Sequence, residues 1–364
     1  MNKDLYCVIM AGGVGSRFWP VSRNEKPKQF LDFLGVGRTF IQQTYDRFAS
    51  FIPNENFIIV TSALHKDIVL EQLPNVPEKN VLLEPFRRNT APCIAYASYR
   101  IKKENPNATI VVAPSDHYIS NELQFIDTIK KGMELAAKEE KLFTIGIPPS
   151  RPETAYGYIQ ANLKEQEIAD GAMIFTVKTF TEKPNKELAE VFIKSGEFLW
   201  NSGIFIWSVS SIVGELEKWL PEVALLFKEG EEMLGTDQED ELITNVYQDC
   251  PTISIDYGVM EKTDIASVIQ ATFGWSDLGT WNSLYLHAQL DENNNFVSCD
   301  EKMMDKVKDC IVISTEKDKL MAIKEMNNMM IINTKDVLMI CPRDEVRFKN
   351  MITDLTIYEK TKFQ

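Results

Sequence analysis

The sequence predicts an α/β protein whose main sheet is mixed and mostly parallel, followed by a small all-β unit. In the first two-thirds of the 364 residues, short apolar runs alternate with helical patterns. Continuous apolar strands separated by helices indicate a sheet that is covered on both faces. After about residue 292 the helical patterns give way to short apolar runs at even spacing, which indicates a separate all-β unit.

The strands expected in the first part of the chain are short apolar runs. They cover residues 6–11, 57–62, 81–85, 109–114 and 142–147. Helices are expected at 90–105 and 122–140. Sheets of this kind bind ligands beyond the carboxyl ends of their strands, and a glycine-rich loop follows the first strand at such an end.

From about residue 150 the pattern is mixed. The expected strands are 156–161, 173–182 and 202–209, the expected helices are 186–195, 210–219 and 222–249, and residues 266–281 predict one more strand, a turn and a helix start. Later, the runs CIVIS, LMAIK, MMIIN and VLMICP begin about eight to ten residues apart. That spacing fits a rolled sheet or a few solenoid turns, and it also fits a plain β-meander. We expect two domains, 1–290 and 291–364.

Composition narrows the class of protein. The net charge of −14, from 39 basic and 53 acidic side chains, argues against a nucleic-acid partner, because phosphate backbones require clustered Lys and Arg. The six cysteines are scattered without a CxxC pair, which favours free thiols over disulfides or a zinc site. The N-terminus does not resemble a signal peptide, and no apolar run approaches the roughly 18 residues that span a bilayer. We therefore expect a cytoplasmic protein without a membrane partner.

The stretch AGGVGSRFWPVSRNEKPKQF (11–30) combines glycines with basic side chains, which indicates an anionic ligand such as a phosphate. No Lys follows the glycines at the GxxxxGK[ST] spacing of a P-loop. A dinucleotide fingerprint needs a third glycine where Phe18 stands, and Pro20 would interrupt its helix. Two interpretations remain. Either the loop is a backbone anion site, with Arg17 and Lys28 neutralising a triphosphate, or it is a glycine turn with surface cations.

The whole string resembles the signature of the sugar-1-phosphate nucleotidyltransferases, specifically the mannose-1-phosphate guanylyltransferase branch, with Phe18 in place of the usual Leu. The resemblance continues in the family's order through EPFRRNTAP, APSDHYI, YGYI, FTEKPN, NSGIFIW and GWSDLGTW, over nearly all of about the first 285 residues. It implies a Rossmann-like nucleotidyltransferase domain followed by a short left-handed β-helix. It also implies a homo-oligomer, expected to be a dimer.

The resemblance implies that GTP and mannose 1-phosphate react to give GDP-mannose and pyrophosphate. An oxygen of the sugar phosphate attacks the α-phosphorus, and pyrophosphate leaves in line. The attacking phosphate is ionised at neutral pH, so no general base is required, and catalysis rests on positioning and charge neutralisation. Since the chain ends at Gln364, we expect it to lack the isomerase domain of longer bifunctional relatives.

By resemblance, Asp116 and Asp277 hold Mg²⁺, which commonly takes one or two protein carboxylates and leaves its other positions to phosphates and water. A lone Asp after a strand is otherwise a helix cap or a turn residue, and this alternative stays open for Asp277. His117 is expected to be structural or to support a neighbouring site residue, because the reaction needs no base.

The other site residues implied by the resemblance fall into three groups. The catalytic cations are Arg17, Lys28 and Lys183; the nucleotide-binding residues are Ala11, Gly12, Gly13, Gly15, Ser16, Glu84, Asn89 and Thr90; the sugar-binding residues are Gly157, Glu182 and Asn201. The alternative for Glu182 and Lys183 is an ordinary surface pair. A helix start with Thr90 as its N-cap is compatible with a base-binding role for the same stretch.

Two other functions stay open. The enzyme could use another nucleotide or another hexose 1-phosphate, because a few pocket contacts set specificity. Alternatively, the chain could be a non-catalytic paralogue that senses GDP-mannose. Such a paralogue is expected to lose phosphate-binding or metal-binding groups. Here those groups are all present, which favours catalysis.

Overall fold

The computed structural model describes residues 2–13, 15–169 and 171–357. The chain divides into two compact units. Unit 1 comprises Met1–Gly12, Thr44–Ser115 and Ile119–Trp275, and unit 2 comprises Gly13–Gln43, Asp116–Tyr118 and Ser276–Gln364. Each unit therefore combines segments that are distant in the sequence. The predicted domain boundary after residue 290 stays a prediction.

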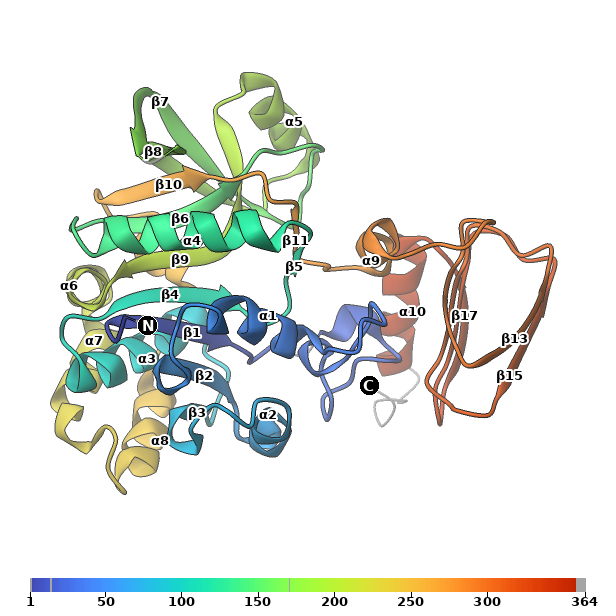
Figure 1. Ribbon diagram of the computed structural model, residues 1–364, viewed down its shortest axis with the longest axis horizontal. Helices are drawn as coiled ribbons and strands as arrows, with labels where there is room; N and C mark the ends of the chain where they lie inside the picture. The colour runs from blue at the N-terminus through green and yellow to red at the C-terminus, as the bar shows by residue number, and fades with distance from the viewer. Residues whose placement is uncertain (1, 14, 170, 358–364) are drawn as a thin grey trace. The chain divides into compact units, whose positions relative to one another are not determined.

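Unit 1 contains a nine-stranded sheet in the order β3-β2-β1-β4-β9-β6-β10-β8-β7 (Figure 1). Its strands are β1 (Leu5–Met10), β2 (Phe57–Ser62), β3 (Val81–Glu84), β4 (Thr109–Pro114), β6 (Leu142–Ile147), β7 (Gly157–Ala169), β8 (Ala172–Glu182), β9 (Phe198–Ser208) and β10 (Ala266–Gln270). Only β8 and β9 run against the direction of the others. The prediction of a mixed, mostly parallel α/β sheet is confirmed.

Helices cover both faces of this sheet. They are α2 (Lys66–Gln72), α3 (Thr90–Glu104), α4 (Glu122–Ala136), α5 (Lys186–Ser195), α6 (Val209–Trp219), α7 (Pro221–Glu229) and α8 (Glu239–Asp249), while α1 (Phe40–Ala49) crosses from unit 2 into unit 1 along the chain. Alternate side chains of β1, β4 and β9, such as Phe205 and Trp207, form one apolar core with α3, α6, α7 and α8. Ile206 points to the opposite face, where it meets α4 at Gly132.

The single helix predicted at 222–249 is wrong. Two helices, α7 and α8, occupy that stretch, with a short 3₁₀ turn (Glu231–Met233) between them. Gly235 has a φ of 73°, a backbone conformation that glycine adopts readily and that a continuous helix excludes. Its missing side chain also leaves room for the Arg100 guanidinium, whose Cζ would lie 2.7 Å from a Cβ at this position. Periodicity alone did not reveal this break.

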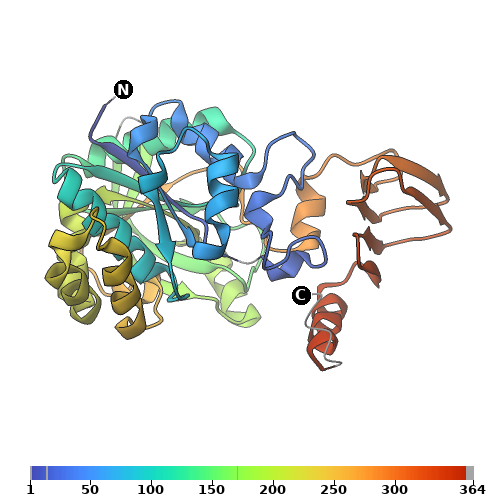
Figure 2. The ribbon, with the colours of Figure 1, turned by 90° about the horizontal axis from the view of Figure 1, so that it is seen from below.

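Unit 2 contains the C-terminal strands, which alternate between two sheets (Figure 2). One sheet has the order β12 (Phe296–Ser298), β14 (Ile311–Ser314), β16 (Met329–Asn333), β17 (Leu338–Pro342), and the other pairs β13 (Glu301–Asp305) with β15 (Leu320–Lys324). All pairs are parallel except β16 with β17. A meander would pair consecutive strands antiparallel, so the parallel pairs argue against a plain β-meander. The left-handed winding stays a prediction.

Two helices of unit 2 flank these strands in the sequence, α9 (Trp281–His287) and α10 (Glu345–Ile357). A cluster of aromatic side chains joins the glycine-loop segment to them. Phe18 lies 5.0 Å from Trp281 and 4.9 Å from Phe33, measured between ring centroids. The same core includes Ile313 and Ile332 from the C-terminal strands. The segment after the glycines therefore shares one apolar core with the C-terminal strands.

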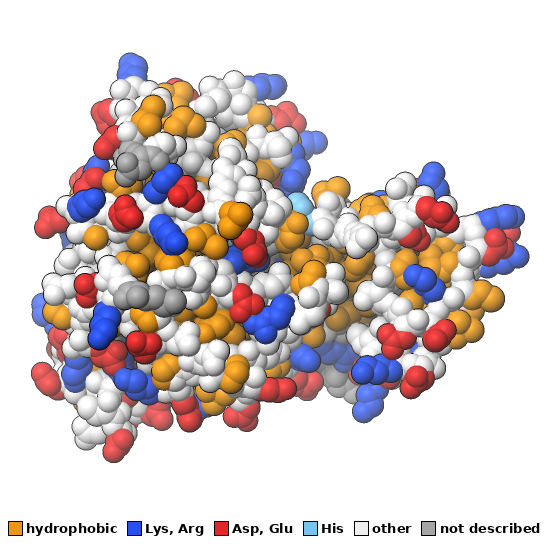
Figure 3. Space-filling view, in the orientation of Figure 1, with side chains coloured by type: hydrophobic (Ala, Val, Ile, Leu, Met, Phe, Trp, Pro, Cys, Tyr) orange, Lys and Arg blue, Asp and Glu red, His pale blue; other side chains and the backbone are white. Residues whose placement is uncertain are grey.

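The surface carries both signs of charge. On the face of unit 1 seen in Figure 3, acidic and basic side chains are interspersed without a large basic area. Among the residues that the structure describes, no helix has the length and apolar character needed to cross a membrane.

Candidate active site

Unit 2 contains a pocket that brings together residues predicted for phosphate and metal binding. Its lining consists of Gly15, Ser16, Arg17, Phe18, Lys28, Asp116, His117, Asp277, Leu278 and Gly279. Three segments of the chain that are distant in sequence thus meet around one pocket. The resemblance implies a site role for six of these residues, and the structure brings the six together around the pocket: Gly15, Ser16, Arg17, Lys28, Asp116 and Asp277.

Lys28 links the two predicted metal ligands. Its Nζ lies 3.0 Å from Asp116 Oδ2 and donates a hydrogen bond to the backbone carbonyl of Asp277 at 2.7 Å. The side chain is only 3% exposed, and its Nζ lies 5.5 Å from the ring centroid of Phe18 and 5.3 Å from that of Phe40. Ion pairing and the aromatic faces stabilise a buried ammonium group. Lys28 is therefore held in one position in the pocket.

Gly15 makes this position of Lys28 possible. Its φ of 58° is one that glycine adopts without strain. A Cβ at this position would lie 2.6 Å from Lys28 Cβ and 2.8 Å from Ser22 Oγ. Any other residue would therefore displace Lys28 or the loop. This contact gives a structural reason for one glycine of the AGGVG stretch.

Asp116 carries its charge in the pocket. Desolvation raises the pKa of Asp116, but the positive charge of Lys28, followed by that of His117, acts in the opposite direction. The net result is a pKa below the ordinary value for Asp, so the carboxylate is ionised at neutral pH. An ionised carboxylate is what a divalent cation requires of its ligand.

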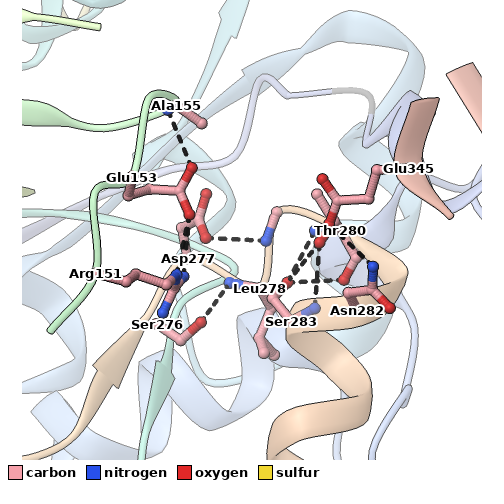
Figure 4. A network of polar contacts seen from close by, with 11 residues as sticks. Arg151, Glu153, Ala155, Ser276, Asp277, Leu278, Thr280, Asn282, Ser283 and Glu345 are labelled. Atoms are coloured by element: carbon pink, nitrogen blue, oxygen red, sulfur yellow. Dashed lines mark hydrogen bonds and ion pairs between the residues drawn. The ribbon is translucent and has the colours of Figure 1, made fainter. Parts of the chain in front are cut away.

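Asp277 follows β11 (Trp275–Ser276) in a tight turn (Figure 4). Its Oδ1 accepts a hydrogen bond from the Gly279 N–H at 2.9 Å, and the intervening Leu278 has a φ of 42°. The N-cap of α9 is Thr280, which forms a capping box with Ser283. Asp277 is thus a turn residue and not a helix cap, and the turn points this part of the chain into the pocket lining.

The predicted sugar-binding residues lie together within unit 1. Gly157 and Glu182 are direct cross-strand neighbours on β7 and β8. A Cβ at Gly157 would collide with Glu182 Oε2 and lie 3.4 Å from Asn201 Cβ, so only glycine lets the three approach. Lys183 Nζ pairs with Glu182 Oε1 at 2.7 Å, and Lys183 has a φ of 48°. A strained backbone beside charged groups is common at functional sites.

Asp256 also belongs to this group, and the sequence analysis did not single it out. Its Oδ1 accepts a hydrogen bond from Asn201 Nδ2 at 2.7 Å. Burial, and then the negative charge of Glu182, raise the pKa of Asp256 to about 6. The residue lies 55 positions after Asn201 in the sequence, so no local pattern connects them.

Among the predicted base-binding residues of unit 1, Gly12 and Glu84 lie together, with Glu84 at the carboxyl end of β3. A Cβ at Gly12 would lie 3.0 Å from Glu84 Oε2, so this carboxylate lies against the backbone of the glycine loop. Its Oε1 accepts a hydrogen bond from the Tyr247 hydroxyl at 3.0 Å. Burial raises the pKa of Glu84 to about 7, although the Tyr247 hydrogen bond acts in the opposite direction. The backbone of neighbouring Ala11 is hydrogen-bonded to β2, through Val60 and Thr61.

The expectation that Thr90 caps α3 is wrong. The N-cap is Asn89, with a φ of 68°, whose Oδ1 accepts a hydrogen bond from the Thr90 N–H at 2.8 Å. The Thr90 hydroxyl instead accepts the Ile255 N–H at 2.9 Å. Asn is a preferred N-cap residue, and the Thr-x-Pro pattern that follows it also suits a helix start.

Comparisons with known proteins agree with this geometry. Residues 6–294 match the family described as "Nucleotidyl transferase". A mannose-1-phosphate guanylyltransferase of Escherichia coli is 36% identical over 365 residues, covering 98% of this chain and 77% of the relative. The alginate biosynthesis protein AlgA of Pseudomonas aeruginosa is 36% identical over 368 residues, covering 98% of this chain and 73% of that protein. A crystal structure from Thermus thermophilus, described as a mannose-1-phosphate geranyltransferase, superposes with a TM-score of 0.83 at 26% identity, over 97% of this chain and 99% of that one.

The α/β sheet and the pocket of cations and carboxylates define a nucleotide-transferring enzyme, and the chain belongs to the nucleotidyl transferase family. Within that family, the similar curated proteins include mannose-1-phosphate guanylyltransferases from Escherichia coli and Klebsiella pneumoniae. This chain spans about three quarters of the length of these relatives.

Proposed function

We propose that this protein transfers GMP from GTP to mannose 1-phosphate, forming GDP-mannose and pyrophosphate. Relatives named for this activity match nearly the whole chain, which supports the assignment. The structural observation that carries it is the contact of Lys28 with both Asp116 and Asp277. One buried cation and two acidic residues in a single pocket suit a reaction between phosphates.

The cations of unit 2 bind the triphosphate of GTP in this proposal. Arg17 and Lys28 line the pocket together with the backbone of Gly15 and Ser16. Gly13 precedes them in the same loop. Two reacting polyanions repel each other, so positive side chains and backbone N–H groups lower the barrier by holding them and by neutralising charge on the leaving group. No proton has to be removed, and His117 therefore stays without a catalytic role.

The residues of the pocket fit a magnesium ion. Asp116 and Asp277 offer two carboxylates, the number that Mg²⁺ commonly takes from a protein. Within the described residues, no cluster of three or more His, Cys, Asp or Glu side chains could hold a metal, so a cage of protein ligands is not the alternative. When bound, the ion would offset the negative charge of the phosphate oxygens. The depressed pKa of Asp116 keeps this ligand ionised.

The base and the hexose are assigned to unit 1. Glu84, beside Gly12, accepts hydrogen bonds from the donor edge of guanine, and Asn89, Thr90 and Ala11 shape the same region. Glu182 accepts hydrogen bonds from hexose hydroxyls, the Asn201 amide group donates to one, and Gly157 permits a close backbone approach. Lys183 binds the sugar phosphate, and its side chain is 60% exposed.

Measuring pyrophosphate release tests this function. The purified protein with magnesium should form GDP-mannose from GTP and mannose 1-phosphate faster than any product from UTP, dTTP or ATP, or from glucose 1-phosphate. Equal rates with all nucleotides would replace GTP specificity by a broader nucleotidyltransferase activity. Binding of GDP-mannose without turnover would instead identify a sensing paralogue. Lys28→Ala and Asp116→Ala should abolish most turnover, because both residues act on the reacting phosphates.

We also propose a homodimer in the cytoplasm. All six cysteines are free and five of them are buried, as a reducing compartment allows. Exposed apolar side chains on the C-terminal strands, at Leu320, Leu338 and Ile340, support self-association through unit 2. Sedimentation analysis of the wild-type protein and of an Ile340→Lys variant tests the dimer. A wild-type protein that sediments as a monomer would contradict it.

A further inference from the structure

Asp256 is a carboxylate without an assigned role inside the group formed by Gly157, Glu182, Lys183 and Asn201. We propose that Asp256 binds a hydroxyl group of the hexose and thereby helps to select which hexose 1-phosphate reacts. This inference rests on the proposed function, because it concerns the sugar substrate of the same reaction. It adds a second carboxylate to the sugar-binding residues that the sequence suggested.

The orientation of the Asn201 amide fixes what Asp256 can do. Asn201 Oδ1 accepts a hydrogen bond from the Gly203 N–H at 3.0 Å, and Thr144 Oγ1 lies 3.4 Å from the same oxygen. A backbone N–H can only donate, so the oxygen and the nitrogen of this amide are not interchangeable. The Nδ2 group therefore faces Asp256 and donates to it at 2.7 Å. Asp256 is an acceptor here, and it is preoriented by a side chain that is itself fixed.

An ionised carboxylate has more acceptor capacity than this contact uses. Its two oxygens offer roughly four acceptor positions, and Asn201 occupies one of them. Burial removes water from the Asp256 carboxylate, and Glu182 repels its negative charge. Keeping Asp256 ionised therefore costs free energy in the protein without ligand. Hydroxyl donors from a hexose would relieve that cost. A ligand with several hydroxyl groups is thus the kind of molecule that this pair of carboxylates suits.

The chain around Asp256 is held firmly to the segment assigned to the base. The Ile253 N–H donates to the Arg88 carbonyl at 3.1 Å, and the Ile255 N–H donates to Thr90 Oγ1 at 2.9 Å. Asp256 then begins a π-helical turn, Asp256–Met260. Such turns are rare overall, and those that do occur are often found at functional sites. The carboxylate is therefore placed by backbone contacts on one side and by Asn201 on the other.

A purely structural role, in which Asp256 only holds the Asn201 amide, makes a different prediction. In that case its removal would weaken every sugar contact in the same proportion. If Asp256 binds one hydroxyl directly, its removal and the removal of that hydroxyl delete the same interaction. The combined effect of the two changes would then be smaller than the sum of their separate effects. This non-additivity is the criterion of a direct contact.

The experiment combines Asp256→Asn with deoxygenated substrates. The wild-type enzyme and the variant are assayed with GTP and mannose 1-phosphate, and with its 2-, 3-, 4- and 6-deoxy analogues. The Asn side chain preserves size and can still accept a hydrogen bond, so folding is retained. Glu261→Gln is the matched control, because Glu261 is an exposed carboxylate five residues along the chain whose charge also acts on the acidic group.

We expect Asp256→Asn to raise the KM for mannose 1-phosphate roughly 10- to 100-fold, with the KM for GTP changed less than about twofold. One deoxy analogue should react about equally well with the variant and with the wild-type enzyme, while Glu261→Gln behaves as wild type. An unchanged sugar KM, or the same loss on Asp256→Asn for every analogue, would overturn the inference alone. A wild-type protein that makes no sugar nucleotide would overturn the proposed function and the inference with it.

Discussion

Arg23, from the segment that follows the glycine loop, binds the carboxylate of Asp336 from the C-terminal part of the chain with both ends of its guanidinium. Its two terminal nitrogens lie 2.8 Å and 2.6 Å from the two carboxylate oxygens, although the residues are 313 positions apart. The Nε–H donates to the Pro20 carbonyl at 3.0 Å. Arg23 belongs to the signature stretch, yet in this structure it binds protein groups. It connects the loop carrying Arg17 to the turn before β17.

Exchanging the two charges tests whether this connection supports catalysis. Arg23→Asp and Asp336→Arg, each alone, should lower the midpoint of thermal unfolding and reduce kcat with GTP, because the loop before Pro20 loses its anchor. The double variant should recover part of both quantities, with a coupling energy of up to about 1 kcal/mol, as expected of a partly exposed pair. Recovery stays partial because Asp at position 23 cannot donate to Pro20.

A surface pair in the same unit serves as the control. Lys306 and Glu325 lie 3.4 Å apart and are 72% and 62% exposed, so reversing them should leave kcat and unfolding unchanged. Arg23→Lys is expected to rescue little, since an ammonium group cannot form the two parallel hydrogen bonds. Full activity in both single charge variants would show that the loop needs no support from the C-terminal strands.

Replacing Lys28 by Met tests the role of the buried cation. Met keeps the aliphatic contact with the aromatic rings and removes the charge. We expect kcat to fall about 100- to 1000-fold, the usual effect of losing one group that stabilises charge in the transition state. Unfolding free energy should drop by about 1–3 kcal/mol, because Asp116 loses its counter-ion but is partly exposed and can be hydrated. Steady-state kinetics and urea unfolding provide both numbers.

Lys26→Met is the matched control for Lys28. Lys26 is exposed and lies two residues away in the same loop. It should keep near-normal kcat. The double variant Lys28→Met with Asp116→Asn should regain stability, since no unpaired charge remains, without regaining activity. A Lys28→Met enzyme with wild-type kcat would remove this residue from the catalytic group.

Local sequence patterns predicted a strand correctly where a single pattern, such as a continuous apolar run, is enough to determine the structure. The runs at 109–114 and 142–147 correspond to β4 and β6 residue for residue, because a continuous apolar run in a covered sheet is a strong signal. The start of β9 was placed at residue 202 instead of Phe198. Polar Asn201 lies inside that strand and interrupts its apolar pattern. Helix α10 lacked a strong apolar period and was not predicted.

Only the site residues that lie in recognisable sequence motifs were predictable. The resemblance identified Lys28, Asp116 and Asp277, and the structure shows one pocket that contains all three. It gave no indication of Asp256 or of the Arg23–Asp336 contact. Both depend on partners far away in the chain, 55 and 313 positions respectively. Such pairs arise from the packing of elements, and a single sequence carries no local trace of them.

Gly157→Ala tests the close approach of β7 to Glu182. An added methyl group would occupy the space of the Glu182 carboxylate, which is the flexible end of a side chain and can move. We therefore expect a modest loss of stability, about 1 kcal/mol or less, but a KM for mannose 1-phosphate raised at least 10-fold. Gly214→Ala in α6 is the control. No neighbouring atom lies within 4 Å of a Cβ there, so it should stabilise the helix slightly and leave kinetics unchanged.

The raised pKa of Glu84 predicts a pH dependence of stability. In the unfolded chain this carboxyl titrates at its ordinary value, near 4.5, and in the folded protein burial raises its pKa to about 7. The folded state thus binds the proton more tightly, so the contribution of Glu84 is fully present below pH 4.5 and is lost as pH rises through 7. Glu84→Gln removes this titration. The free energy of unfolding of Glu84→Gln, relative to that of wild type, should therefore rise by about 2 kcal/mol as the pH goes from 5 to 8.

Urea unfolding of wild type and Glu84→Gln at pH 5 and pH 8 measures this difference directly. Tyr247→Phe is the control, because it removes the hydrogen bond to Glu84 that favours the ionised form. Its stability should fall more steeply than that of wild type as pH rises from 5 to 8. The same carboxylate is assigned to guanine, whose donors stabilise the ionised form, so saturating GTP should flatten the wild-type profile but not that of Glu84→Gln. Identical pH profiles for wild type and Glu84→Gln without ligand would show that Glu84 is hydrated in the folded protein.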